Sequence, residues 1–351
     1  KHLIMKISIL LPYKENFSSE YAGAVSLQLR DTVKISKFKK NIRIFGSTTF
    51  KQNLLKKNYV NLNTKKFFFQ SRSNVYIKNF LDYEKKKPSD LIEIHNRPNY
   101  VKKIYEINKN LVLYFHNDPL DTKGSKNVIE RNDLLKKVRK IIFISNWTKK
   151  QFLKGVNKFL IKNKQLEVIS HSTNKKIISF KNKKNIILFV GRLNKSKGYD
   201  VFGNSIINLL DKFPNWTAIV IGDEPREKHT FKHKNLKILG FKKYSIVSNY
   251  FRDADISVVC SRWNEPFGRT ALEASSCGCA VIITNRGGLP EASPKALKIK
   301  SLTVKNVEKS IKKLIKNETF KKSLQRRIYK NFYLTNNYIS KKIDRYRDKL
   351  I

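Results

Sequence analysis

The sequence predicts an α/β protein with two domains, each built on a doubly wound parallel sheet. The chain has 351 residues, enough for two domains that each bury a full core. Apolar runs of strand length alternate along it with segments of helical periodicity. Polar residues follow directly after most of these runs, as they do where parallel strands end at a ligand-binding edge. A hydrophobic share of 40% with 11% aromatic residues favours a globular protein over a disordered one.

The first half of the chain contains the apolar runs of one predicted sheet. They cover residues 5–12, 41–46, 91–95, 111–115, 141–144 and 166–169. Met5 opens the first run and is the expected natural start, with residues 1–4 as upstream read-through. A loop with Gly23 joins this strand to a helical pattern that begins near residues 21–25. A strand, a glycine loop and a helix start can together form an anion-binding corner.

Two histidines stand at the ends of predicted strands in this half. His95 closes the run 91–95, and His116 directly follows the run 111–115. A histidine at a strand end is commonly a structural hydrogen-bonding group, and a role in chemistry is the alternative. Ser145 follows the strand at 141–144, where a helix N-cap and a site role are equally open.

The second half repeats the alternation after a polar, lysine-rich segment over 170–185, which is the predicted linker. Strands are predicted at 186–190, 218–221, 255–260 and 280–283, with a helix over 199–213. The predicted domains are residues 1–180 and 181–330, followed by a basic helical segment over 331–351.

One stretch of this half brings two carboxylates to a predicted helix start. It is residues 263–274, Trp-Asn-Glu-Pro-Phe-Gly-Arg-Thr-Ala-Leu-Glu-Ala. Pro266 is predicted in the first helical turn, which places Glu265 on the preceding loop and Glu273 on the helix. The backbone N–H groups of Phe267 and Gly268 would then face out of the helix N-terminus and favour a phosphate or carboxylate. A glutamate pair at this spacing is by itself a weak signal.

A second motif follows the predicted strand at 186–190. It is residues 191–198, Gly-Arg-Leu-Asn-Lys-Ser-Lys-Gly. Gly191 permits a tight turn, Arg192 offers a planar fork of donors suited to phosphate, and Lys197 adds a mobile point charge. Taken alone, the motif is also compatible with a basic surface turn in a lysine-rich protein.

Together the two motifs resemble the Gly-Arg-Leu to Lys-Gly loop and the Glu-Pro-Phe-Gly to Leu-Glu-Ala signature of the family 4 glycosyltransferases. The resemblance is strong over residues 186–295 and extends to the N-terminal domain in layout only. It implies the GT-B fold, with two facing Rossmann-like domains and a central cleft. It also implies that the C-terminal helix within 331–351 crosses back to the N-terminal domain.

The resemblance assigns roles to the motif residues. Arg192 and Lys197 would neutralise the donor diphosphate, Glu265 would accept hydrogen bonds from the sugar, and Glu273 from the ribose. His116 would contact the transferred sugar or the acceptor. In the family, two adjacent glycines usually lie beside the diphosphate, where this chain has only Gly23. The expected catalytic residues are Glu265, His116, Arg192 and Lys197, and the expected donor-binding residues are Gly23, Gly191, Phe267, Gly268 and Glu273.

The function that the resemblance implies is retaining transfer of a sugar from a nucleotide-diphosphate donor to a glycan or lipid-linked acceptor, in lipopolysaccharide or polysaccharide biosynthesis. No cofactor and no metal site are expected, because cationic side chains suit the leaving diphosphate. A soluble sugar-phosphate or glucan synthase of the same fold is the alternative enzyme. A basic, non-catalytic module that binds lipid or nucleic acid is a third and weaker hypothesis.

The formal net charge of +47 bears on partners and location. Such a charge attracts an anionic membrane surface, although a lysine-rich composition explains it equally well. No zinc finger, RNA-recognition signature or basic zipper indicates specific nucleic-acid binding. Three cysteines in one region, without a signal peptide pattern, favour a reducing cytoplasm. The expected location is cytoplasmic, with peripheral attachment to the inner face of the cell membrane as an extension.

Overall fold

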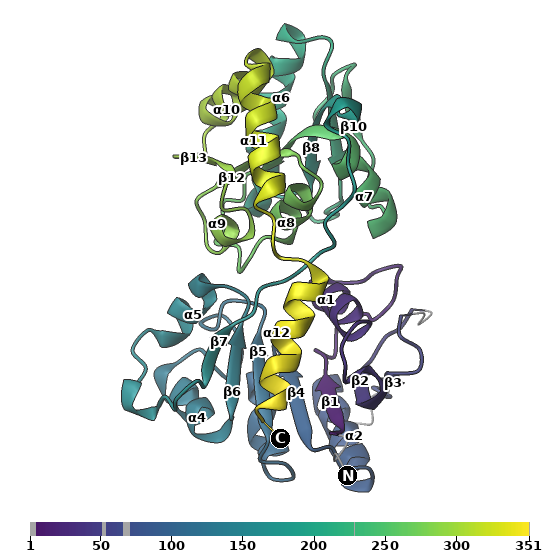
Figure 1. Cartoon of the computed structure of the whole chain (residues 1–351), viewed down its shortest axis with the longest axis vertical. Helices are drawn as coiled ribbons and strands as arrows, with labels where there is room; N and C mark the ends of the chain where they lie inside the picture. Colours follow the sequence, from purple (N-terminus) through teal and green to yellow (C-terminus); the bar gives the residue numbers. More distant parts are fainter. Residues whose placement is uncertain (1–4, 51–53, 66–70, 228, 351) are drawn as a thin grey trace. The chain divides into compact units, whose positions relative to one another are not determined.

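The computed structural model describes residues 5–50, 54–65, 71–227 and 229–350, so the predicted read-through at residues 1–4 lies outside the described residues. The chain forms two compact units (Figure 1). Unit 1 contains residues up to 172 and the C-terminal segment from 336, and unit 2 contains residues 173–335. Each unit is an α/β structure around one parallel sheet.

The sheet of unit 1 has the strand order β3-β2-β1-β4-β5-β6-β7 in the described residues, and neighbouring strands are parallel. Its strands are β1 Ile7–Leu10, β2 Ile42–Gly46, β3 Tyr59–Asn61, β4 Leu91–His95, β5 Leu111–Phe115, β6 Lys140–Phe143 and β7 Leu166–Val168. The strand order reverses between β1 and β4. Ligands of doubly wound sheets bind beyond the carboxyl ends of the strands at such a switch point.

Helices connect these strands and cover the sheet. They are α1 Ala24–Val33, α2 Arg72–Lys86, α3 Val101–Tyr105, α4 Val128–Lys137, α5 Asn146–Leu153 and α12 Asn336–Asp348. Ser145 caps α5 through a capping box with Thr148, which confirms the N-cap interpretation of Ser145. Apolar side chains of β4 and β5 are completely buried in the core, among them Ile92, Ile94 and Leu113.

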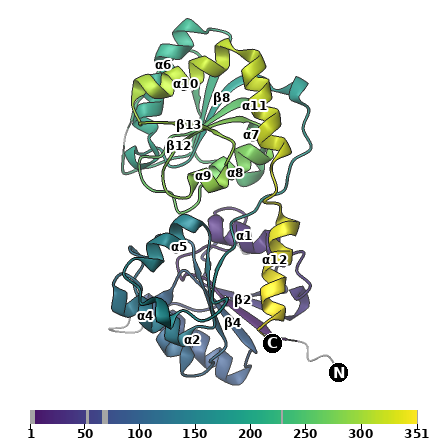
Figure 2. The ribbon, with the colours of Figure 1, turned by 60° about the vertical axis from the view of Figure 1, so that its left-hand side comes forward.

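Unit 2 has the strand order β10-β9-β8-β11-β12-β13, again with parallel neighbours. Its strands are β8 Lys184–Val190, β9 Thr217–Ile221, β10 Leu236–Ile238, β11 Ala254–Val259, β12 Ala280–Thr284 and β13 Leu297–Ile299. Its helices are α6 Tyr199–Lys212, α7 Tyr244–Asp253, α8 Arg269–Ser276, α9 Leu289–Ala292, α10 Val304–Lys316 and α11 Glu318–Lys330. Figure 2 shows α6 and α10 on one side of this sheet and α7 and α8 on the other.

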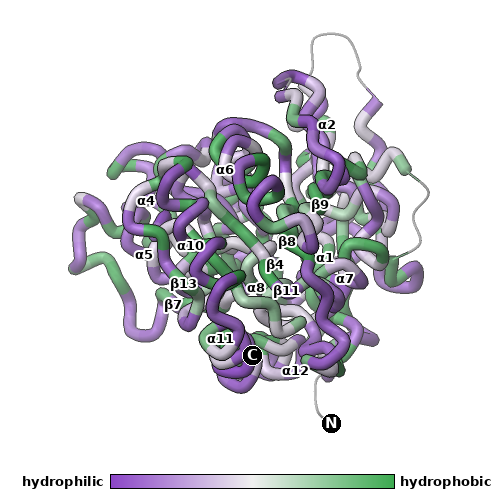
Figure 3. Tube along the Cα trace, turned by 90° about the horizontal axis from the view of Figure 1, so that it is seen from above, coloured by the Kyte–Doolittle hydropathy of each residue, from purple (hydrophilic) through white to green (hydrophobic). Residues whose placement is uncertain are grey.

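The hydropathy of the elements explains this layering. Figure 3 shows hydrophobic colouring along strands such as β4 and β8 and hydrophilic colouring along much of α11 and α12. A strand buried on both faces reads as a continuous apolar run, whereas a covering helix needs only one apolar stripe. In the part of the chain that the structure describes, no helix combines the length and apolarity needed to cross a bilayer.

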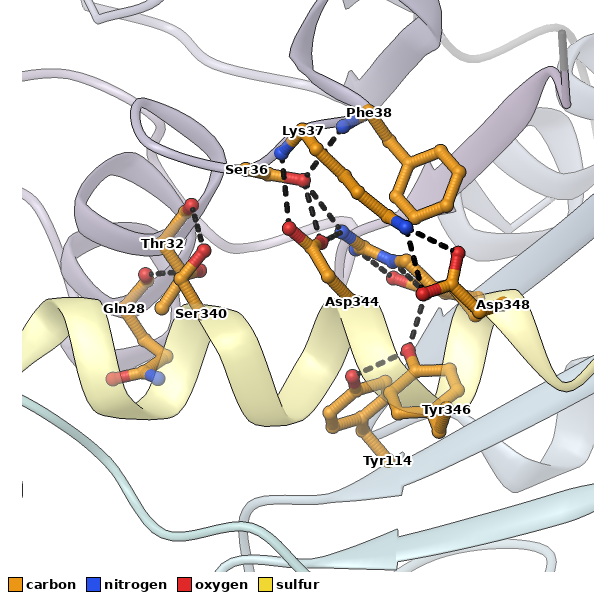
Figure 4. A network of polar contacts seen from close by, with 12 residues as sticks. Gln28, Thr32, Ser36, Lys37, Phe38, Tyr114, Ser340, Asp344, Tyr346 and Asp348 are labelled. Carbon is orange, nitrogen blue, oxygen red and sulfur yellow. Dashed lines mark hydrogen bonds and ion pairs between the residues drawn. The ribbon is translucent and has the colours of Figure 1, made fainter.

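The C-terminal helix α12 is fixed to unit 1 by a buried polar network (Figure 4). Arg347 is 2% exposed and forms a two-pronged ion pair with Glu93 of β4, with Nε–Oε1 and Nη2–Oε2 distances of 2.8 Å. The hydroxyl of Tyr346 also donates to Glu93 and lies 2.6 Å from the hydroxyl of Tyr114. At the helix surface, Lys37 pairs with Asp348 at 2.5 Å.

Candidate active site

The two sequence motifs of unit 2 begin at the ends of adjacent strands. Strand β8 ends one residue before Gly191, and β11 ends at Val259, one residue before the loop that carries Glu265. These strands are hydrogen-bonded neighbours, and the strand order of the sheet reverses between them. The sheet therefore brings both motifs to its switch point, where ligands of such sheets bind.

The turn after β8 depends on two glycines. Gly191 has φ +153° and donates its N–H to the carbonyl of Ile221 at 3.0 Å. A Cβ on Gly222 would lie 1.8 Å from the carbonyl oxygen of Gly191, so the two turns touch backbone to backbone. Arg192 follows as an exposed side chain without a hydrogen bond or ion pair to any described residue. Its guanidinium is available to a phosphate group.

Lys197 and Glu265, the two charged residues expected to bind different parts of a donor, bind each other. The Lys197 ammonium lies 2.5 Å from Oε1 of Glu265. The same carboxylate oxygen accepts a hydrogen bond from Ser261 at 2.6 Å, and the ammonium lies 5.4 Å from the centre of the Trp263 ring. Glu265 is only 7% exposed, so its charge depends on these partners. The sequence predicted both residues for the site but not their pairing.

Helix α8 starts later than predicted. It begins at Arg269, and Gly268 at its N-cap position has φ +109°, a left-handed conformation that cannot belong to a right-handed helix. The prediction that Pro266 lies in the first helical turn is therefore wrong, whereas Glu265 on the loop and Glu273 on the helix are confirmed. The amides of Phe267 and Gly268 precede the helix start, and Phe267 is 2% exposed.

Glu273 lies in the second turn of α8 and is paired along the helix. Its Oε1 accepts from Nε of Arg269 at 2.7 Å, four residues earlier. The Arg269 guanidinium also lies 5.9 Å from the centre of the Tyr244 ring. The pairing holds the buried Glu273 carboxylate in one orientation at the helix start, which suits a group that accepts hydrogen bonds from hydroxyls.

Gly287 supports Glu265 from the turn after β12. It has φ +57°, and a Cβ there would lie 2.1 Å from the carbonyl oxygen and 2.7 Å from the amide nitrogen of Glu265. Gly240 has a similar φ of +67°, but a Cβ there would meet nothing within 4 Å. The two glycines therefore share the conformational requirement and differ in their neighbours.

This difference gives a matched pair of substitutions. Gly240→Ala should lower the free energy of unfolding by about 1–2 kcal/mol, the penalty of a left-handed alanine. Gly287→Ala should cost more and also displace Glu265, because the backbone atoms that it meets cannot rotate away. Chemical denaturation measures both losses. Equal losses for the two variants would contradict the proposed support of Glu265.

In unit 1, His116 is held between two other histidines. Its Nε2 lies 2.9 Å from Nδ1 of His95, and its Nδ1 lies 3.1 Å from Nε2 of His171. Burial, with the Arg347 charge as a second cause, lowers the pKa of His95 to about 3. Burial, followed by the charge of His95, lowers the pKa of His116 well below its usual range. Both rings are therefore neutral near pH 7.

The corner around Gly23 already holds a carboxylate. Glu15 Oε1 accepts from the backbone N–H of Ser26 at 3.0 Å and from its hydroxyl at 2.8 Å, at the start of α1. A Cβ on Gly23 would lie 2.5 Å from the same oxygen. The helix start predicted to bind a donor anion thus binds an anion of the protein itself. A phosphate would have to displace Glu15 to use this Ser26 N–H.

Three residues of these sites were missed from the sequence. Ser261 contacts Glu265, His171 falls in the predicted linker, and Asn96 adopts φ +55° and accepts from the backbone N–H of His116 at 3.1 Å. One signal was present for His171. Like His95 and His116, it stands at or just beyond the end of a strand of one parallel sheet.

Comparisons with known proteins agree with this arrangement. Residues 170–333 match the family model described as glycosyl transferases group 1. The chain is 26% identical over 230 residues to a putative glycosyltransferase, YtcC, of Bacillus subtilis (strain 168), covering 57% of this chain and 56% of YtcC. It is 32% identical over 127 residues to the lipopolysaccharide core biosynthesis mannosyltransferase LpsB of Rhizobium meliloti (strain 1021), covering 33% of this chain and 36% of LpsB. The matched part of the chain thus spans 56% of the length of YtcC and 36% of the length of LpsB.

The solved structures extend the likeness to nearly the whole chain at the level of fold. The crystal structure of Anabaena Alr3699/HepE in complex with UDP and glucose matches with a TM-score of 0.74 and 16% identity. The match covers 98% of this chain and 99% of that one. The two parallel Rossmann-like sheets are thus those of the GT-B fold, as the sequence predicted. Residues 170–333 thus form a domain of the group 1 glycosyl transferase type, which is also called family 4.

Proposed function

We propose that this protein is a retaining glycosyltransferase that moves a sugar from a nucleotide-diphosphate donor to a glycan or lipid-linked acceptor. The observation that carries the proposal is the meeting of both motifs at the switch point of unit 2, where Lys197 lies 2.5 Å from Glu265. A nucleotide sugar requires cations for its diphosphate and hydrogen-bond acceptors for its hydroxyl groups. The two motifs bring one group of each kind, Lys197 and Glu265, to the same strand ends.

The cationic residues would serve the leaving group. Breaking a glycosyl–phosphate bond builds negative charge on the diphosphate. The exposed Arg192, the ammonium of Lys197 and the backbone amides of Phe267 and Gly268 are groups that stabilise such charge. Gly191 would let the backbone of the turn approach the phosphates closely. We propose that this set of groups supplies the stabilisation without a metal ion.

The carboxylates would orient the donor. Glu265 would accept hydrogen bonds from the sugar hydroxyls once Lys197 turns to the diphosphate, and Glu273 would accept from the ribose. In unit 1, Gly23 would allow the chain to approach the donor once the donor displaces the Glu15 carboxylate from this corner, and His116 would face the transferred sugar or the acceptor. Neither glutamate need be a nucleophile, because the acceptor of a retaining enzyme of this kind is thought to attack the face from which the diphosphate leaves.

The acceptor class and the location are also part of the proposal. The similarity to LpsB, which is described as a mannosyltransferase of lipopolysaccharide core biosynthesis, favours a role in lipopolysaccharide or polysaccharide biosynthesis. A net charge of +47 favours attachment to an anionic membrane surface, because Lys and Arg near such a surface are each attracted to it. We therefore place the enzyme in the cytoplasm, at the inner face of the membrane.

Thermal unfolding with a panel of nucleotide sugars tests the donor site. A ligand at a hundred times its dissociation constant stabilises a protein by about 2.7 kcal/mol. The true donor should therefore raise the melting temperature more than any other nucleotide sugar of the panel does. The shift should persist in EDTA and be lost in Glu273→Ala.

A matched control exists for Glu273. Glu318→Ala removes another ion pair between residues four apart, with Lys322 at 2.7 Å on α11, and should leave the shift intact. If no nucleotide sugar stabilises the wild type, the proposed function is wrong.

A further inference from the structure

The two motif loops of unit 2 are joined by more than the ion pair of Lys197 with Glu265. One loop follows β8 and the other follows β11. The carbonyl of Ser196, in the loop after β8, accepts from two backbone N–H groups of the loop after β11. These belong to Arg262, at 2.9 Å, and Trp263, at 3.2 Å. The loops are therefore linked through their backbones as well as through their two functional side chains.

The side chain of Arg262 strengthens this link. Its Nη2 lies 2.9 Å from Oδ2 of Asp200, and its Nη1 lies 3.2 Å from Oδ1, which makes a two-pronged pair. Nη1 also donates to the carbonyl of Lys195. A planar guanidinium with acceptors on both terminal nitrogens is fixed in direction as well as in place. Arg262 thus attaches the loop after β11 to the loop after β8 and to the start of α6.

The pair of Arg262 with Asp200 is charged but not deeply buried. Burial alone would raise the pKa of Asp200, but the hydrogen bonds and the charge of Arg262 lower it below its usual value. The side chains of Arg262 and Asp200 are 44% and 24% exposed. An ion pair this exposed contributes little to global stability. Its effect should therefore appear in the placement of the loops.

The backbones of the two loops leave no space between them. Gly198 has φ +73°, and a Cβ there would lie 2.0 Å from the carbonyl oxygen of Cys260. One loop therefore cannot shift toward the other, and a shift away from it must break the hydrogen bonds to Ser196. The contacts of Arg262 oppose that separation.

Donor binding would remove one of the two side-chain links. In the proposed function, Lys197 leaves Glu265 and turns to the diphosphate. Arg262 and Asp200 have no part in donor binding there, so their pair remains in place. The loops then depend on this pair and on the hydrogen bonds to Ser196. The pair should consequently matter most when a diphosphate is bound.

We infer that Arg262 is a positioning residue, which through Asp200 holds the two motif loops at the spacing at which both can bind one diphosphate. The inference rests on the proposed function for the diphosphate site. The link between the loops does not depend on it. Arg262 itself would not touch the donor, because both terminal nitrogens of its guanidinium already have acceptors in Asp200 and Lys195.

Binding of nucleoside diphosphates tests the positioning role. UDP, GDP and ADP are titrated into the wild type by calorimetry, and the one that binds most tightly is the probe for the variants. Arg262→Gln should weaken its binding by about 10- to 100-fold, because misplacement of an active-site group by about 1 Å can cost about 100-fold. Unchanged binding in Arg262→Gln would overturn the inference.

Asp200→Asn separates a positioning role from direct phosphate binding by Arg262. If Arg262 positions the loops, Asp200→Asn should weaken binding about as much as Arg262→Gln does. If Arg262 binds the diphosphate instead, loss of the Asp200 charge frees its guanidinium and should strengthen binding. Arg262→Lys keeps the charge without the planar fork, so it should restore little. Stronger binding in Asp200→Asn, or full binding in Arg262→Lys, would contradict the positioning role.

A matched control lies at the other ends of the same two strands. Lys184 at the start of β8 pairs at 2.7 Å with Asp253, directly before β11, and the two side chains are 64% and 35% exposed. Lys184→Gln removes this exposed ion pair without touching either motif loop. It should leave binding of the probe unchanged. An equal loss in Lys184→Gln and Arg262→Gln would mean that the contact of Arg262 has no special role.

Hydrogen exchange tests the link without any ligand. In Arg262→Gln, peptides that span residues 191–198 and 260–266 should exchange faster than in the wild type, because the hydrogen bonds to Ser196 lose their support. Lys184→Gln should leave these peptides unchanged. Unchanged exchange in Arg262→Gln would show that its side chain does not hold the loops together.

The two readouts separate this inference from the proposed function. If the wild type binds none of the three nucleotides, the proposed function and the positioning role both fail. Hydrogen exchange would then still decide whether Arg262 links the loops. If the wild type binds a nucleotide and Arg262→Gln binds it equally well, the inference alone is wrong.

Discussion

Replacement of Glu265 by Ala or Gln is expected to abolish sugar transfer while the protein stays folded. Glutamine is the sharper test, because it keeps an oxygen that can accept from Ser261 and Lys197, at present 2.6 Å and 2.5 Å from Oε1, and removes only the charge. Loss of one preorganised electrostatic group typically lowers kcat by 10²- to 10³-fold. We expect a loss of at least about 100-fold, measured as transfer at saturating donor.

The control for Glu265→Gln is Glu308→Gln. Glu308 also pairs with a lysine of unit 2, Lys212 at 3.3 Å, but on helices α6 and α10 rather than on the two motif loops. Its loss should leave transfer and folding unchanged. Full activity of Glu265→Gln would remove the carboxylate from the proposed mechanism. Unfolding of Glu265→Gln, but not of Glu308→Gln, would show that Glu265 is needed for structure instead.

Arg347→Met is expected to destabilise unit 1 far more than the loss of an exposed ion pair would. It leaves the carboxylate of Glu93, which is 0% exposed, without its cation. Removal of one partner of a buried ion pair costs about 3–5 kcal/mol, because the remaining charge is stranded in the interior. Hydrogen exchange of peptides from β4 and β5 measures this loss for unit 1 separately from unit 2.

Two further variants identify the cause. Lys37→Met breaks the exposed ion pair that Lys37 forms with Asp348, the residue after Arg347 on α12. It should lower the free energy of unfolding by no more than about 1 kcal/mol. The double variant Glu93→Gln with Arg347→Met removes both members of the buried pair and should recover most of the loss. If the double variant is as unstable as Arg347→Met, then lost packing of the long arginine side chain, rather than a stranded charge, accounts for the effect.

The sequence was sufficient for the fold class and for most central strands. The runs 91–95 and 111–115 match β4 and β5, because a strand buried on both faces is apolar throughout. The edge strands β3 and β13 were not predicted. Each has only three residues and is partly exposed, so neither an apolar run nor a long alternation marks it.

For the site, residue types and strand ends could be predicted from the sequence, but partners could not. Spacing placed Lys197 and Glu265 on separate loops, and only the pairing of β8 with β11 brings them into contact. The same limit explains the missed role of His171, whose partner His116 is distant along the chain. Gly23 illustrates a competing effect: the helix start was predicted to attract an anion, and the nearby carboxylate of Glu15 meets that attraction.

The placement of α12 in unit 1 has a consequence for how the protein is made. Glu93 leaves the ribosome 254 residues before Arg347, its only cationic partner among the described residues. At about 5–20 residues per second, the ribosome needs roughly 13–50 s to cover this interval. Unit 2, residues 173–335, is made within this interval and is complete 12 residues before Arg347, while unit 1 still lacks the helix that neutralises its core. A nascent chain that stops before α12 would therefore carry a complete second domain attached to a first domain in which the buried carboxylate of Glu93 has no cation.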